Sequence, residues 1–388
     1  MTNYIILALC SIILIAYLFD LSGRFSKIPG VLLLILMGMG IRIISAYTGF
    51  VIPNLRPVLP VIGTLGLIMI VMEASLDIHL KKEKKGLLVS SVSSALILLL
   101  VFTGAFSFIL VNFFGTGVHD SLVNAIPLGI ISSSIAIPSA ATLNQDDREF
   151  VVYESSFSDI FGIMLFDLVL INETSIGAGL FTFIRNGLLT VIIALISTGL
   201  LGYLLHRSTF HVNYVIILTF IVLIYSLAKL IHLPALLVIL IFGLVLANTQ
   251  FIEIDFLKRF FDFQKFRGDI GSFKKILGEL TFLVRSFFFI MFGYYTPVYG
   301  LFSINNLLTG LLISAGILFS RWLFFRHFLR TQVHPLVFFA PRGLITILLF
   351  LSIPEASRIP LISGEVVTIV MLTTIILMTV GSITRRTG

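Results

Sequence analysis

The chain has 388 residues, of which 58% are hydrophobic and only 12% are charged, and its formal net charge is +7. Its mean hydropathy of +1.10 lies outside the range of ordinary soluble domains, so the composition indicates an integral membrane protein. The positive charge lies in short loops between apolar runs and comes without an RNA-binding motif, so it indicates membrane topology and not nucleic acid binding.

The first apolar run, at residues 4–20, is expected to be a retained membrane span. No basic residue precedes it, and no clear small-residue cleavage site follows it, so it does not have the pattern of a signal peptide. Cys10 is the only cysteine of the chain, so no intrachain disulfide can form.

Charged and turn-rich breaks divide the remaining sequence into further spans. A bilayer core about 30 Å thick needs about 20 apolar residues per helix, which gives about thirteen spans. The spans are expected at approximately 4–20, 30–48, 58–76, 87–112, 121–143, 150–172, 180–205, 212–230, 234–249, 276–298, 305–327, 334–353 and 363–384. The predicted fold is therefore an all-α polytopic membrane protein.

Lysines and arginines fall mainly in alternate loops, as in the lysine-rich run 81–85. By the positive-inside rule, this asymmetry predicts an N-terminus outside and a C-terminus in the cytoplasm. The long polar connection at 249–275 is then cytoplasmic. Its phenylalanines predict an amphipathic segment on the membrane surface, and a regulatory or partner-binding role is the alternative.

Ionisable side chains inside a membrane span are costly and indicate a functional site. The sixth span carries Glu154, Asp159 and Asp167. Ser155 lies four residues before Asp159, so both side chains share a helix face and could offer oxygens to a hard cation. A buried carboxylate holds a proton or a cation and is seldom left as a bare charge. The alternative for Asp159 is a packing acid bonded to a serine of another helix, and Asp167 is expected to line a polar vestibule.

Other charged residues also lie within the expected spans. They are Glu73, Arg285, Arg321, Arg342 and Glu365.

Prolines interrupt the fifth and the twelfth spans. Pro138 follows Ala136 in a serine-rich stretch, and Pro341 stands beside Arg342. Proline removes a backbone donor, so we expect each span to unwind there and to free carbonyl groups. Each proline by itself could also make an ordinary kink.

The two interrupted spans occupy corresponding places in the chain. Counted outward from the seventh span, the fifth and twelfth are equivalent members of two inverted six-helix repeats. We expect one membrane transporter domain over 1–388, with repeat one at about 4–172, a linking span at 180–205 and repeat two at about 212–384. Paired broken helices of this kind are typical of the binding site of secondary transporters.

These motifs together resemble the sodium/proton exchanger branch of the cation/proton antiporter superfamily. The most specific match is 154–159, Glu-Ser-Ser-Phe-Ser-Asp, which is similar to the family's Glu-Ser-x-x-Asn-Asp signature. The segment 72–76 is similar to the third-helix segment with an acidic residue near the ion site. The segment 341–344 is similar to the Leu-Arg-Gly element of the second broken helix. The likeness also covers the glycine-rich second helix at 28–40 and the aromatic block at 286–293.

The resemblance implies a transporter that exchanges Na⁺ or Li⁺ for H⁺ by alternating access, and not an enzyme. It implies no cofactor besides the transported cation and proton. The implied ion- or proton-binding residues are Asp159, Ser155, Glu73, Ser158 and Ala136, with Asp159, Ser155 and Glu73 as Na⁺ ligands. Glu154 and Arg321 are implied to form a structural ion pair, with direct ion binding by Glu154 as the alternative, and Pro138, Pro341 and Arg342 belong to the crossover helices.

Two positions depart from the family pattern. Ser158 stands where members have asparagine before the aspartate, and 136–138 reads Ala-Ile-Pro where many have Thr-Asp-Pro. The crossover therefore lacks one carboxylate, for which backbone carbonyls and serine hydroxyls could compensate in part. Electrogenic members carry a second aspartate at the position of Ser158, so its absence favours electroneutral exchange.

A potassium/proton antiporter of the same fold is the main alternative, and a cation channel is a further one. A membrane-embedded enzyme is not favoured, because the seven histidines show no metal-ligand spacing. The resemblance also implies a multi-pass protein of the plasma or inner membrane and a homodimer. The expected partners are a monovalent cation, a proton and the lipid bilayer, without nucleic acid.

Overall fold

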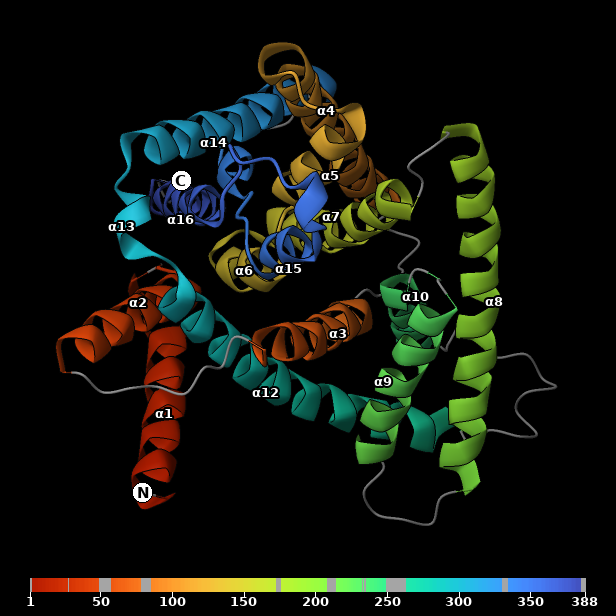
Figure 1. Cartoon of the computed structure of the whole chain (residues 1–388). Coiled ribbons are helices and arrows are strands. Elements are labelled where there is room, and N and C mark those ends of the chain that lie inside the picture. Colours follow the sequence, from red (N-terminus) through yellow and green to blue (C-terminus); the bar gives the residue numbers. More distant parts are fainter. Residues whose placement is uncertain are drawn as a thin grey trace. The chain divides into compact units, whose positions relative to one another are not determined.

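The computed structural model is all-helical in the part of the chain that it describes. This part comprises residues 2–26, 28–48, 57–77, 85–171, 176–207, 214–231, 233, 235–248, 263–329 and 334–384, and it contains no β-strand. Its helices (Figure 1) are α1 (Thr2–Ser26), α2 (Gly30–Thr48), α3 (Leu59–Asp77), α4 (Lys85–Phe114), α5 (Val118–Gly129), α6 (Ser133–Ser139), α7 (Gln145–Ile171), α8 (Ile176–Arg207), α9 (Tyr214–Leu230), α10 (Ala235–Ala247), α12 (Phe263–Tyr295), α13 (Val298–Leu301), α14 (Ile304–Phe324), α15 (Leu344–Ser352) and α16 (Gly364–Ile383).

The helices follow the predicted spans. Each span corresponds to one long helix or to a pair of helical segments, which confirms the all-α polytopic fold. Seven helical stretches among the described residues are long and apolar enough to cross a membrane, and shorter apolar helices accompany them. The start of α12 differs most from the prediction, since this helix begins at Phe263 and not at 276.

Two predicted features lie partly outside the residues that the structure describes. Residues 81–84, with most of the lysine-rich run, and residues 249–262, with the first half of the predicted surface segment, lie outside the described residues. The second half of that segment forms the beginning of α12.

The chain divides into two compact units by its internal contacts. Unit 1 comprises Met1–Gly63, Gly86–Gly162 and Leu283–Gly388, and unit 2 comprises Thr64–Lys85 and Ile163–Phe282. These units do not coincide with the two predicted sequence repeats, which stay a prediction.

Small residues allow close helix packing in unit 1. Gly38 of α2 lies against the backbone of Ile290 in α12, and Gly293 of α12 lies against the backbone of Ile35 in α2, so neither site has room for a side chain. Such contacts are usual between membrane helices. Moving an apolar side chain from lipid to a helix interface gives no hydrophobic gain, so small residues that allow close backbone packing stabilise the interface instead. In the same unit, α14 packs along α16, and α15 packs against α5 (Figure 1).

Unit 2 is built around α10. This helix is apolar on all sides and packs against α8 and α9, which lie beside it in Figure 1. Gly243 of α10 lies against Ser75 and Met72 of α3. A helix that is hydrophobic all round is expected to be buried among its neighbours.

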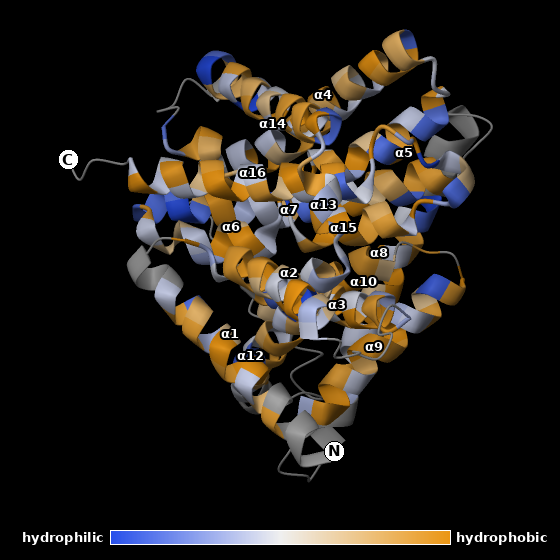
Figure 2. Ribbon diagram, turned by 60° about the vertical axis from the view of Figure 1, so that its left-hand side comes forward, coloured by the Kyte–Doolittle hydropathy of each residue, from blue (hydrophilic) through white to orange (hydrophobic). Residues whose placement is uncertain are grey.

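Large apolar side chains also cover outward faces of the long helices. Examples are Leu188, Ile196 and Leu200 on α8 and Leu312 and Phe319 on α14, all of them exposed. In Figure 2, hydrophobic residues, in orange, lie along the long helices, with paler and blue residues between them. Such faces are costly in water but favourable against lipid tails, so the chain is a multi-pass membrane protein.

Candidate ion-binding site

Two broken helices meet in unit 1. The chain is extended between the end of α5 at Gly129 and the start of α6 at Ser133, and extended again before α15 begins at Leu344. The backbone N–H of Ser132 donates to the carbonyl of Pro341 at 2.9 Å, so the two extended segments are joined. A Cβ atom at Gly343 would lie 2.6 Å from both Ser132 Oγ and Ile135 Cδ1, so a larger residue there would have to displace these side chains.

The break of the first helix lies earlier than predicted. We expected the chain to unwind around 136–138, but these residues are helical and belong to α6, while the extended stretch lies at 130–132. The carbonyl of Ala136 accepts the backbone N–H of Ala140. A helix tolerates a proline when another donor takes the carbonyl that the proline leaves free, and Arg285 supplies one here.

Asp159 of α7 lies at the N-terminus of α6. It is only 3% exposed, and its Oδ2 accepts the backbone N–H of Ser133 at 3.2 Å and a hydrogen bond from the Ser133 hydroxyl. The first N–H groups of a helix have no partner within the helix and carry a partial positive charge. The short helix α6 is therefore oriented to stabilise the carboxylate of Asp159.

The second oxygen of this carboxylate is open. Asp159 Oδ1 is buried and has no hydrogen-bond partner among the described residues. An unsatisfied buried oxygen is costly, and a charged one is more costly still. This oxygen is thus the place where a proton or a small cation would stabilise the structure most.

Arg342 lies at the C-terminal end of the other half-helix, α5. It is 3% exposed, and its guanidinium donates to the carbonyls of Leu128 at 2.7 Å and Gly129 at 3.3 Å, at the C-terminal end of α5. Carbonyls at a helix C-terminus carry a partial negative charge, so a cation is favourable there. Where the two broken helices cross, the Asp159 carboxylate thus lies at the start of α6 and the Arg342 guanidinium lies at the end of α5.

Two serines of α7 precede Asp159 in sequence and differ in their contacts. Ser158 Oγ accepts the backbone N–H of Ile131 at 2.9 Å, so it fixes the extended segment. Ser155 Oγ donates to the Val151 carbonyl of its own helix at 2.7 Å and keeps its lone pairs available. An ion-ligand role of either serine stays a prediction.

Glu154 and Arg321 form a buried bidentate pair. Arg321 Nη1 lies 2.9 Å from Glu154 Oε1, and Nη2 lies 3.0 Å from Oε2, with exposures of 2% and 1%. Ser94 of α4 donates a further hydrogen bond to Glu154. Arg321 also donates to the carbonyls of Leu336 at 2.8 Å and Val337 at 3.2 Å. The pair therefore connects α4, α7, α14 and the turn that leads to the second broken helix.

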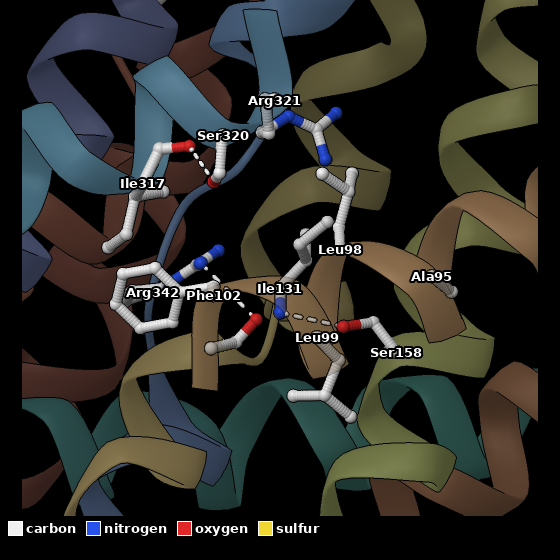
Figure 3. Close-up of a pocket in the computed structure, with 11 residues that line it drawn as sticks. Ala95, Leu98, Leu99, Phe102, Ile131, Ser158, Ile317, Ser320, Arg321 and Arg342 are labelled. Carbon is white, nitrogen blue, oxygen red and sulfur yellow. Dashed lines mark hydrogen bonds between the residues drawn. The ribbon is translucent and has the colours of Figure 1, made fainter. Parts of the chain in front are cut away.

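A small cavity lies beside the extended segment of the first broken helix (Figure 3). Its polar lining is Ser158, Ser320, Arg321 and Arg342, and its apolar lining comes from α4 together with Ile131 and Ile317. Its volume of about 10 Å³ is at the lower limit for one water molecule, so it admits no organic substrate.

Two of the predicted residues belong to unit 2, whereas Asp159 belongs to unit 1. Glu73 belongs to unit 2, where it lies beside Gly278 of α12, and its predicted role as a cation ligand stays a prediction. Asp167 is half-buried in unit 2, where Lys229 of α9 is a charged neighbour.

One contributor was missed at the sequence level, since Ser94 carries no local signal of its own. Arg285 was noted only as a charge within a span, without a role, although the carbonyl left free by Pro138 requires a donor from elsewhere.

No group of three or more His, Cys, Asp or Glu side chains in the described ranges is arranged to hold a metal ion. At the crossing in unit 1, the carboxylate of Asp159 is accompanied by serine hydroxyl oxygens. Oxygen donors of this kind suit a hard cation.

A membrane protein with a buried acid between two broken helices belongs to the class of secondary ion transporters. The profile of the family described as "Sodium/hydrogen exchanger, transmembrane" matches residues 10–387, so the chain belongs to this family. This confirms the resemblance seen in the sequence. It makes the chain an antiporter of cations and protons rather than an enzyme.

Solved structures support the same fold. The chain is similar to a structure of the sodium proton antiporter MjNhaP1 from Methanocaldococcus jannaschii at pH 8, with a TM-score of 0.73, 17% identity and coverage of 99% of both chains. An electron-microscopy structure of the same antiporter gives a TM-score of 0.71 and 18% identity, with coverage of 98% of this chain and 95% of that one. Among curated protein sequences, none matches significantly.

Proposed function

We propose that the protein exchanges Na⁺ for H⁺ across the membrane and that both ions use Asp159. The observation that carries this proposal is the asymmetric carboxylate, with Oδ2 held by Ser133 and Oδ1 buried without a partner in the described part of the chain. One open oxygen on one acid accepts either a proton or a cation, and competition for it couples the two fluxes.

The remaining cation ligands are proposed from the donor chemistry. Ser155 Oγ lies one turn from Asp159 on the same helix, and Glu73 is the acidic residue that the family resemblance assigns to the site. Na⁺ is favoured as the cation because the structurally similar MjNhaP1 is described as a sodium proton antiporter. K⁺ exchange by a protein of the same fold remains the alternative. A cation channel is less favoured, because the buried ion pair of Glu154 and Arg321 suits the closed site of a carrier.

The proposed cycle is alternating access. The broken helices, with α7 and α16, would shift so that Asp159 faces each side in turn, loaded with Na⁺ or H⁺ but not both. With one titrating carboxylate and serine at position 158, one proton exchanges for one Na⁺ and no net charge moves. We further propose a homodimer in the plasma or inner membrane, with the N-terminus outside and the C-terminus in the cytoplasm.

The decisive experiment measures dequenching of a pH-sensitive dye in proteoliposomes with an imposed proton gradient. Addition of Na⁺ should collapse the gradient with the wild-type protein, Li⁺ should act similarly, and K⁺ should act weakly. Asp159→Asn should abolish the response, because the amide cannot exchange a proton for a cation. A K⁺-selective response would support the alternative exchanger, and a wild-type response in Asp159→Asn would exclude Asp159 as the carrier.

A further inference from the structure

Pro138 leaves one carbonyl of α6 without its helical partner. In an α-helix the carbonyl of residue i accepts the N–H of residue i+4, and for Ser134 that residue is Pro138, which has no N–H. Ser134 is only 7% exposed, so bulk water does not replace the missing donor. A buried carbonyl of this kind needs a partner from outside the helix.

Arg285 of α12 supplies that partner. Its Nη1 lies 3.1 Å from the Ser134 carbonyl oxygen, and its side chain is 15% exposed. Both residues belong to unit 1, although 151 positions separate them in the sequence. A charged donor makes a stronger hydrogen bond than a neutral one, so this contact fixes the first turn of α6 against α12.

The same turn of α6 holds Asp159. Ser133, directly before Ser134, donates its backbone N–H and its hydroxyl to the carboxylate. α6 has seven residues, which is too short for a helix that is stable by itself. Its position therefore depends on the side chains that bind it, and Arg285 and Asp159 bind consecutive residues of one turn.

Asp20 of α1 is a charged neighbour of the Arg285 guanidinium. Its Oδ1 lies 4.0 Å from Arg285 Nη2, and its side chain is 46% exposed. An ion pair at this distance with one exposed member is weak. Asp20 therefore assists Arg285 without neutralising it.

We propose that Arg285 is a positioning residue that acts on Asp159 through the first turn of α6. This inference rests on the proposed exchange at Asp159. Arg285 does not bind the cation, but it keeps the two Ser133 donors on Oδ2 so that Oδ1 stays open. Loss of the Arg285 donor lets the turn shift. This shift weakens cation binding, so it raises the Na⁺ concentration for half-maximal transport more than it lowers the maximal rate.

The test combines removal of the donor with its restoration from within α6. In proteoliposomes, Arg285→Met should raise the Na⁺ concentration for half-maximal dequenching about tenfold and change the maximal rate by less than about threefold. Pro138→Ala places an N–H four residues after Ser134, so the double variant should regain most of the wild-type Na⁺ dependence. A wild-type response of Arg285→Met, or a double variant no better than Arg285→Met, would overturn the inference.

Two further variants serve as matched comparisons. Arg42 also donates to backbone carbonyls, those of Tyr294 at 3.5 Å and Thr296 at 2.7 Å, at the far end of α12. Arg42→Met therefore removes similar bonds away from α6 and should stay within about twofold of wild type. Asp20→Asn should raise the half-maximal Na⁺ concentration by only about two- to threefold, because Asp20 is exposed and lies 4.0 Å from Arg285. A tenfold effect of Arg42→Met would mean that loss of any arginine that donates to backbone carbonyls acts through general stability.

Failure of the proposed function can be told apart from failure of this inference. If the wild-type protein responds to none of Na⁺, Li⁺ and K⁺, exchange at Asp159 is wrong, and hydrogen–deuterium exchange then tests Arg285 directly. Arg285→Met should accelerate amide exchange in peptides that cover α6, and the added Pro138→Ala should slow it again. Unchanged exchange of α6 in Arg285→Met would reject the positioning role.

Discussion

The two carboxylate oxygens of Asp159 meet different surroundings. Oδ2 accepts two donors from Ser133, whereas Oδ1 is buried and has no partner among the described residues. Helical spacing within one span was enough to group Asp159 with Ser155. It could not pair Asp159 with Ser133, because that contact joins two different helices.

Loss of the Ser133 hydroxyl should weaken cation binding. Ser133→Ala keeps the backbone donor but removes one hydrogen bond to a charged carboxylate, which is worth about 1.5–3 kcal/mol. We expect the Na⁺ concentration for half-maximal transport to rise about tenfold, as measured by dequenching in proteoliposomes. Ser134→Ala is the matched control, because the Ser134 hydroxyl bonds to the Ser132 hydroxyl at 2.9 Å and not to Asp159. Equal effects of the two variants would contradict the assignment.

The pair of Glu154 and Arg321 should matter mainly for stability. Glu154→Gln leaves a buried guanidinium without its counter-charge, which typically costs about 3–5 kcal/mol. We expect a clear fall in the melting temperature of the detergent-solubilised protein. The double variant Glu154→Leu/Arg321→Met removes both charges and should lose less than the sum of the single variants. Additive losses would mean that the two side chains do not act as a pair.

At the level of elements, the two broken helices depend on each other. Proline in each span predicted the interruptions, and the resemblance predicted that they would be crossover helices. The sequence misplaced the first break at 136–138, because Pro138 is held inside α6 by a donor from α12. A proline in the sequence signals a missing N–H, but only the surrounding helices decide whether the chain unwinds there.

Gly343→Ala should disturb the contact between the two broken helices. Its Cβ would lie 2.6 Å from Ser132 Oγ and Ile135 Cδ1, so these side chains must move. We expect transport in proteoliposomes to fall about tenfold or more, because overpacking of this kind costs about 1–3 kcal/mol at the site itself. Gly316→Ala is the control, since no atom lies within 4 Å of its Cβ position on α14. Normal transport by Gly343→Ala would show that the contact between the segments is dispensable.

At the scale of the whole molecule, the distribution of charge predicts electroneutral exchange. Within the described part of unit 1, the crossing offers one open carboxylate, while Glu154 is paired with Arg321 and position 158 is serine. Exchange of one proton for one Na⁺ should therefore be insensitive to membrane potential. Transport rates measured with potentials of either sign, imposed by K⁺ and valinomycin, should agree within about 1.5-fold. A rate that rises steeply with one sign of the potential would show that net charge moves in each cycle.

The sequence by itself determined the membrane class, the spans and the acid of the site. These properties follow from local composition, since a bilayer requires long apolar helices and makes any buried charge conspicuous. Only the tertiary structure decided that Asp159 lies at the start of α6, that Arg342 lies at the end of α5 and that Arg285 replaces the N–H missing from Pro138. Each of these contacts joins distant parts of the chain. Buried polar groups must have hydrogen-bond partners, and only the fold decides which residues are near enough to supply them.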